Sequence, residues 1–318
     1  MTLEVGIRRD PHTHGYRHDA FFYSGMDEFI RGTAQFLRDG LAERAAMLVV
    51  VSAEKIERLK AELGDGAESI TFRDMSEVGK NPARISPVWQ AWVQEQMSAG
   101  RPLRGIGEPA TPDRRFDELM ECARHESFLN IAFEGSEPFW LLCPYDMATL
   151  ERNVVDEARR THPSWIADGE GRASDDYVPV DTVAPFSPPL PPLLGSVESV
   201  QFIDDEMRLV RELTSKAAQT AGFSRDKEWD LVLAVNELAT NSIRHGGGVG
   251  TLRVAVEGDR VVCEVSDQGH IRDPLIGRVP PDAAGSSGRG LWIANQLCDL
   301  VQLHSTPSGT TVRLTMRA

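Results

Sequence analysis

Apolar residues in the first half of the chain occur in short runs separated by amphipathic stretches. Residues 46–51 form a continuous apolar run, as expected for a strand that is buried on both faces. Strands that alternate with helices predict an α/β layer fold with a mostly parallel sheet over residues 14–165. The other expected strands are 20–23, 70–74, 103–107 and 139–143, and the expected helices are 26–41, 53–63, 86–99 and 116–130.

The last third of the chain has a different pattern, in which a long helix precedes two hairpins. Apolar residues recur at helical spacing from Glu228 to His245, and a run of glycines ends that helix. The next two segments alternate apolar and polar residues around Gly258, which predicts an antiparallel hairpin. The expected elements are an amphipathic segment at 199–221, strands at 251–256, 260–266, 301–305 and 310–316, and a short helix at 291–300.

A proline-rich segment separates the two patterns. Residues 166–175 are polar and rich in glycine, and residues 185–195 are rich in proline, which favours an extended, semi-rigid spacer. The sequence therefore predicts domains at 14–165 and 198–318 that are joined by a linker at 166–197.

Composition narrows the functional classes. A chain of 318 residues is long enough for two domains, and its net charge of −14 disfavours direct nucleic-acid binding. Neither a signal peptide nor a membrane span is recognisable, and the cysteines lack paired spacing, so a cytoplasmic protein with reduced thiols is expected. Metal binding by Cys122, His125 and Cys143 is conceivable but is not the favoured interpretation.

Candidate chemistry begins on the long helix. Glu237, Asn241 and His245 are four residues apart and therefore lie on one helical face. A carboxylate and an amide on such a face suit Mg²⁺, which prefers oxygen ligands. The competing interpretation is a solvated polar stripe, and His245 is interpreted as a partner of the helix dipole.

A second candidate follows the first hairpin, where Asp267 and Gly269 end a strand. The carboxylate can accept a hydrogen bond from an exocyclic amine such as that of adenine, and the glycine lets backbone approach a flat base. An ordinary turn is the alternative.

A third candidate comes after a long irregular segment at 270–287, a length that is typical of functional loops. Gly288 and Gly290 open the next helix, where exposed N–H groups favour an anion, and Arg289 adds a positive charge. A loop end with a helix cap is the alternative.

Together these motifs resemble the ATPase superfamily shared by gyrase, histidine kinases and mismatch-repair ATPases, which implies a two-layer α/β sandwich at 198–318. Within it, the compact size and the 288–292 sequence resemble the bacterial anti-sigma factors that act as serine kinases. No histidine lies between His162 and His245, which disfavours a histidine kinase with its own phosphoacceptor. The residues that carry the resemblance are Glu237 and Asn241, Asp267 and Gly269, and Gly288 and Gly290, with 270–287 as the ATP lid.

The resemblance implies phosphoryl transfer from Mg·ATP to a serine or threonine of an anti-sigma antagonist, with a sigma factor as the second partner. Such kinases generally dimerise, so a homodimer is compatible with it. Two alternatives stay open: a non-catalytic, ATP-dependent sigma-factor-binding protein, and an orphan histidine-kinase-like protein. The implied roles are Glu237 as the base, Asn241 as the Mg²⁺ ligand, Asp267 for adenine, and Gly288, Arg289 and Gly290 for the phosphates.

The first domain resembles the MEDS sensory domain, a degenerate relative of RecA-type ATPases. The resemblance rests on His18 with Phe22-Tyr23, and on 104–108, 141–146 and His162-Pro163. No G-x-x-x-x-G-K-[ST] motif occurs, so ATP hydrolysis is not expected in this half. The sensory candidates are His18, Glu108, Glu126 and Asp146, at or near strand ends where α/β sheets bind ligands; structural roles are the alternative for each.

Overall fold

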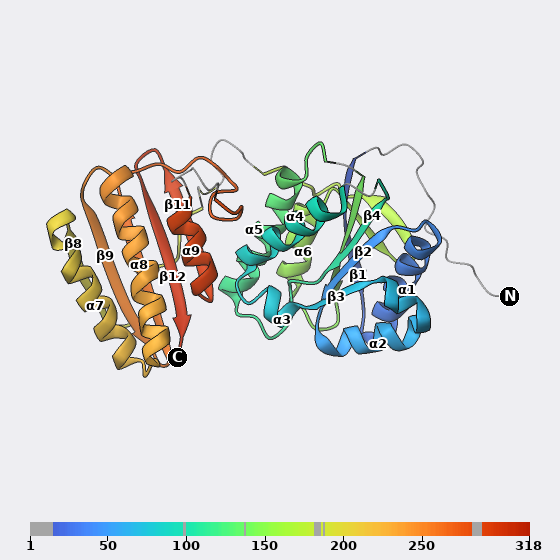
Figure 1. Cartoon of the computed structure of the whole chain (residues 1–318), viewed down its shortest axis with the longest axis horizontal. Helices are drawn as coiled ribbons and strands as arrows, with labels where there is room; N and C mark the ends of the chain where they lie inside the picture. The colour runs from blue at the N-terminus through green and yellow to red at the C-terminus, as the bar shows by residue number, and fades with distance from the viewer. Residues whose placement is uncertain (1–14, 98–99, 137, 181–185, 187, 282–287) are drawn as a thin grey trace. The chain divides into compact units, whose positions relative to one another are not determined.

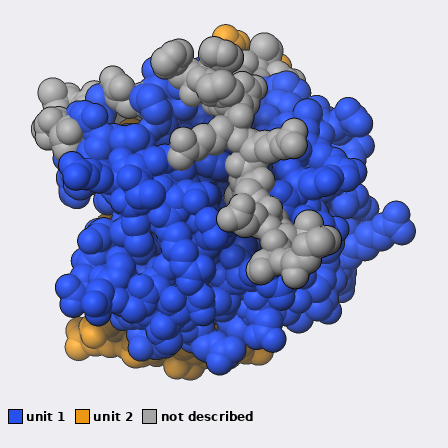
Figure 2. All heavy atoms as spheres, turned by 90° about the vertical axis from the view of Figure 1, so that its right-hand side faces the viewer, with its two compact units in different colours: residues 1–180 blue, residues 181–318 orange. Residues whose placement is uncertain are grey.

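The computed structural model describes residues 15–97, 100–136, 138–180, 186, 188–281 and 288–318. The chain divides into two compact units, residues 1–180 and 181–318, which Figure 2 distinguishes by colour. Each unit has its own sheet, mostly parallel in the first and antiparallel in the second. This confirms the mixed α/β fold class predicted from the sequence.

Unit 1 is built on a seven-stranded sheet. Its strands are β1 (Tyr16–Tyr23), β2 (Ala46–Val51), β3 (Thr71–Asp74), β4 (Leu103–Gly107), β5 (Phe139–Asp146), β6 (Ser164–Ala167) and β7 (Glu170–Ala173). Its helices are α1 (Met26–Ala42), α2 (Ala53–Leu63), α3 (Met75–Val78), α4 (Ile85–Gln96), α5 (Phe116–Ala132) and α6 (Arg152–Thr161), with 3₁₀ turns η1 (Gly64–Ser69) and η2 (Pro82–Arg84). The strand order is β3-β2-β4-β5-β1-β6-β7, and only β6 and β7 pair antiparallel.

Helices cover both faces of this sheet, with α1 and α2 on one side and α4, α5 and α6 on the other (Figure 1). Strand β2 shows why its apolar run is continuous. Leu48 and Val50 belong to the core that contains α4 and α5 residues, whereas Val49 and Val51 belong to the core that contains α1 and α2 residues. A strand between two helical layers has no polar face to present.

The predicted linker was wrong at its start. Residues 164–173 form the β6–β7 hairpin, in which Trp165 pairs with Ala20 of β1. The hairpin turns at Asp168 and Gly169, both with positive φ, and β7 is an exposed edge strand. Its polar, glycine-rich composition therefore reflects a turn and an edge strand.

Two other differences concern helices. The sequence did not predict helix α6, and residues 98–99 of the expected 86–99 helix lie outside the described residues.

Unit 2 has a five-stranded antiparallel sheet with the order β11-β12-β10-β9-β8. Helix α8 packs on β9, β10 and β12, and α7 and α9 flank it, giving two layers (Figure 1). The expected 199–221 segment begins as a strand, and the helix expected at 291–300 ends at Leu297. The elements are β8 (Val197–Phe202), η4 (Asp204–Glu206), α7 (Met207–Thr220), α8 (Arg225–His245), β9 (Gly250–Glu257), β10 (Arg260–Asp267), α9 (Arg289–Leu297), β11 (Leu300–Thr306) and β12 (Gly309–Arg317).

Described residues of the proline-rich segment belong to unit 2 and do not form a free spacer. The Phe186 side chain is buried, and its carbonyl accepts a hydrogen bond from the Ser305 amide. The carbonyls of Pro188 and Pro191 accept hydrogen bonds from His304 and Arg313. Proline lacks an N–H but keeps its carbonyl, so such a segment can pair with side chains of β11 and β12. Residues 185 and 187 lie outside the described residues.

Among the described residues, no helix combines the length and the apolar character that a membrane crossing requires.

Candidate functional site

Unit 2 contains a cavity of about 220 Å³ next to the end of α8. Its walls are largely apolar and include Leu238, Ile271 and Val312. An apolar cavity with few polar groups is the usual form of a small-molecule site. Four of the residues expected to bind nucleotide line it: Asn241, Asp267, Gly269 and Gly288.

The Asp267 carboxylate is held in a fixed orientation at the end of β10. Its Oδ2 accepts a hydrogen bond from Ser242 Oγ at 2.6 Å, and its Oδ1 accepts one from the Gly269 amide at 2.7 Å. Thr310 Oγ1 donates to the Gly269 carbonyl at 2.8 Å, which fixes the turn. A carboxylate oxygen has two acceptor positions, so each oxygen can accept one further hydrogen bond.

The start of α9 lies against Asn241. Gly288 caps the helix with a φ of 77°, a left-handed conformation that favours glycine. A Cβ added to Gly290 would lie 2.4 Å from Asn241 Nδ2, so a larger residue would displace the Asn241 amide. Backbone N–H groups at a helix start and a nearby amide form an arrangement suited to phosphate.

The other candidate residues of this site lie in or beside the cavity. Glu237 is half-buried on α8, one turn before Asn241, and does not line the cavity. The Arg289 side chain is exposed in the first turn of α9. His245 does line the cavity at the end of α8. The sequence did not predict Ser242 or Thr310, because single hydroxyl residues in a helix and a strand carry no distinguishing pattern.

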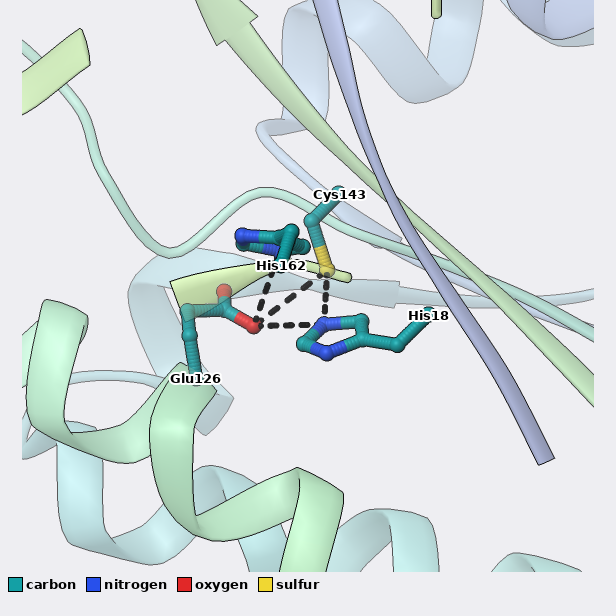
Figure 3. Close-up of side chains that lie close together, drawn as sticks. All are labelled: His18, Glu126, Cys143 and His162. Atoms are coloured by element: carbon teal, nitrogen blue, oxygen red, sulfur yellow. Dashed lines mark hydrogen bonds and ion pairs between the residues drawn. The ribbon is translucent and has the colours of Figure 1, made fainter. Parts of the chain in front are cut away.

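In unit 1, two of the four sensory candidates meet. His18 Nε2 lies 3.0 Å from Glu126 Oε2, and Cys143 and His162 complete a buried cluster around them (Figure 3). Cys122 and His125 are not part of it. Cys122 Sγ donates to the Pro109 carbonyl, and His125 Nδ1 lies 3.0 Å from Ser86 Oγ.

The other two candidates lie at the carboxyl ends of β4 and β5. Glu108 Oε1 accepts hydrogen bonds from Tyr23 Oη at 2.5 Å and from Lys55 Nζ at 2.6 Å. Burial raises the pKa of Glu108, although Lys55 and the Tyr23 hydroxyl act in the opposite direction. Asp146 accepts hydrogen bonds from the amides of Gly25 and Ala148 and thereby braces two loops.

Comparison with known families matches each unit to a domain family. A model of the MEDS domain (MEthanogen/methylotroph, DcmR Sensory domain) matches residues 17–163, and a model of the histidine kinase-like ATPase domain matches residues 203–316. The serine-protein kinase RsbW of Bacillus licheniformis is 31% identical in an alignment of 121 residues that covers 34% of this chain and 75% of that protein. The chain belongs to the RsbW family.

A second RsbW protein agrees with this assignment. RsbW of Bacillus subtilis (strain 168) is 29% identical over 121 residues and is likewise covered to 75% of its length. A crystal structure of the RsbU and RsbW domains of Rv1364c from Mycobacterium tuberculosis is 21% identical, with a TM-score of 0.28 over 38% of this chain and 32% of that chain. The cavity thus lies within the ATPase-domain match, and the His18 cluster lies within the MEDS match.

Proposed function

We propose that the chain is a cytoplasmic anti-sigma factor kinase, which binds Mg·ATP in the unit 2 cavity and phosphorylates a serine or threonine of an antagonist protein. A sigma factor would be its second partner, and unit 1 would supply sensory control. The observation that carries the proposal is the convergence of Asn241, Asp267 and the α9 N-terminus on one cavity in an RsbW relative.

The residues present fit Mg·ATP. The apolar walls suit an adenine ring, and the free acceptor positions of Asp267 suit its exocyclic amine. The Asn241 side chain offers an oxygen of the kind Mg²⁺ prefers, beside a helix start suited to phosphate. Bound Mg²⁺ would neutralise charge on the transferring phosphoryl group.

In this proposal the chain's own residues mainly position the reactants, because phosphoryl transfer depends chiefly on orientation and charge. Gly288 and Gly290 hold the phosphates through backbone N–H groups, and Arg289 adds positive charge. Glu237, one turn along α8 from Asn241, accepts the hydroxyl proton of the substrate side chain.

The test is transfer of label from Mg·[γ-³²P]ATP to protein in a heat-treated lysate of the source organism, with purified full-length chain as the kinase. We expect a labelled protein whose phosphate survives acid, as phosphoserine and phosphothreonine do. Label that acid removes would indicate the histidine-kinase-like alternative. No label, with nucleotide still bound, would contradict the kinase and favour a nucleotide-dependent binding protein.

A further inference from the structure

Four side chains from separate segments of unit 1 converge inside its core. His18 comes from β1, Glu126 from α5, Cys143 from β5, and His162 from the residue after α6 (Figure 3). One ligand atom from each lies within 4.8 Å of every other, and all four residues are buried. They lie in the layer between the sheet and α5 and α6, where Cys143 belongs to the apolar core.

Hydrogen bonds outside the cluster orient both imidazoles. His18 Nδ1 lies 2.9 Å from Asn130 Oδ1, and the Asn130 amide is fixed because its Nδ2 donates to the Thr161 carbonyl. His162 Nδ1 lies 2.8 Å from the Ala158 carbonyl. Carbonyl oxygens only accept, so Nδ1 carries the proton in each ring. In the neutral rings, both Nε2 lone pairs therefore face the cluster, an arrangement typical of histidine metal ligands.

The cluster contains more acceptors than donors. Glu126 Oε1 and His162 Nε2 are buried without a hydrogen-bond partner. Glu126 Oε2 lies 3.0 Å from His18 Nε2 and 3.4 Å from Cys143 Sγ. In the part of the chain that the structure describes, no lysine or arginine forms an ion pair with Glu126.

We propose that His18, Glu126, Cys143 and His162 bind one transition-metal ion, and that Zn²⁺ fits them best. Two imidazoles, a thiolate and a carboxylate form a mixed donor set that suits zinc, whereas Mg²⁺ and Ca²⁺ require oxygen ligands. Zinc bonds of about 2.0–2.3 Å place tetrahedral ligand atoms about 3.3–3.8 Å apart. Four of the six separations, 3.0, 3.3, 3.4 and 3.6 Å, are close to that range, and the other two are no longer than 4.8 Å.

A bound cation would also satisfy the groups that the protein leaves unpaired. It would accept both Nε2 lone pairs and bind the Cys143 sulfur as a thiolate. Four protein ligands close a tetrahedral site, which is typical of structural or sensing centres and not of catalytic ones. The inference does not rest on kinase activity, because it concerns unit 1 alone.

The test uses the full-length chain after removal of metal with a chelator. Competition against a chromogenic chelator should show one Zn²⁺ bound per chain, and Cys143→Ser and His162→Gln should each weaken affinity by at least about 100-fold. Cys122→Ser is the matched control, because Cys122 is an equally buried thiol in unit 1 outside the cluster, and it should bind Zn²⁺ like the wild type.

A spectroscopic measurement on the wild type keeps the test decisive if a variant fails to fold. Addition of Co²⁺ should give a thiolate-to-metal charge-transfer band together with the visible bands of a four-coordinate ion. Absence of stoichiometric Zn²⁺ binding, or Co²⁺ binding without the thiolate band, would overturn the proposal.

Discussion

We expect Glu237→Gln to lower the rate of phosphoryl transfer by about 10²- to 10⁴-fold, the usual contribution of a positioned general base. Glutamine keeps the size of the side chain but cannot accept the hydroxyl proton. Glu237 does not line the cavity that holds Asn241 and Asp267, so Mg·ATP affinity should change little. The measurements are the single-turnover rate of phosphoryl transfer to the substrate protein that the lysate experiment labels, and the affinity for Mg·ATP by calorimetry.

Glu228→Gln supplies the control on the same helix. Glu228 lies at the start of α8, where its carboxylate accepts hydrogen bonds from Ser215 and Gln219 of α7, and its replacement should leave transfer close to the wild-type rate. Unchanged transfer in Glu237→Gln would show that another group acts as the base. Equal loss of transfer and ATP affinity would instead assign Glu237 to nucleotide binding.

We expect Lys55→Met to destabilise unit 1 by about 3–5 kcal/mol, since it leaves the Glu108 carboxylate buried without its cation. Lys55 Nζ contacts both carboxylate oxygens at 2.6 Å, and the Glu108 side chain is 3% exposed. Methionine preserves the apolar stem of the lysine. Urea unfolding monitored by tryptophan fluorescence should report the loss, because Trp89 and Trp92 lie in the unit 1 core.

Lys60→Met is the matched control on α2, because the pair of Lys60 with Glu57 is exposed and should contribute at most about 1 kcal/mol.

The effect of Lys55→Met should also depend on pH. Burial already raises the Glu108 pKa above 4.5, and loss of Lys55 raises it further. A raised folded-state pKa favours the protonated form, so the destabilisation should shrink as pH falls toward 5 and grow as pH rises. Equal losses in both variants at all pH values would contradict this account.

The local sequence pattern predicted most of the elements, because the faces that an element buries determine where its apolar residues lie. The β2 run and the α8 stripe are examples, since each is fixed by which face packs on a neighbour. The β6–β7 hairpin was missed for the opposite reason. Its second strand is an exposed edge with no apolar face, so its polar composition could not be distinguished from a linker.

The sites depended on tertiary structure to different degrees. Asn241 was named for its spacing from Glu237 on one helix face, and Asp267 and Gly288 because each stands at an element end; all three line one cavity. The cluster in unit 1 was not found, although His18 and Glu126 were named separately. Cys143 joins His18 only because β1 and β5 pair in parallel with Ala20 opposite Cys143, a register that sequence spacing does not encode.

The metal set that the sequence did not favour, Cys122, His125 and Cys143, is not a cluster among the described residues, for a related reason. Cys122 and His125 share a face of α5, but Cys122 contacts the Pro109 carbonyl and His125 contacts the Ser86 hydroxyl. These contacts depend on the tertiary fold and cannot be predicted from residue spacing. The partner that completes the cluster, His162, follows a helix that the sequence pattern did not predict.

Isothermal titration of the full-length chain with Mg·ATP tests the central claim most directly. We predict micromolar affinity, weakened about 10- to 150-fold by Asp267→Asn and by Asn241→Ala, since each removes a hydrogen bond or a ligand worth about 1.5–3 kcal/mol. Asp273→Asn is the control, because the Asp273 carboxylate lies in the same loop region but does not line the cavity. No binding by the folded wild type, or equal binding by all three variants, would contradict a nucleotide site in this cavity.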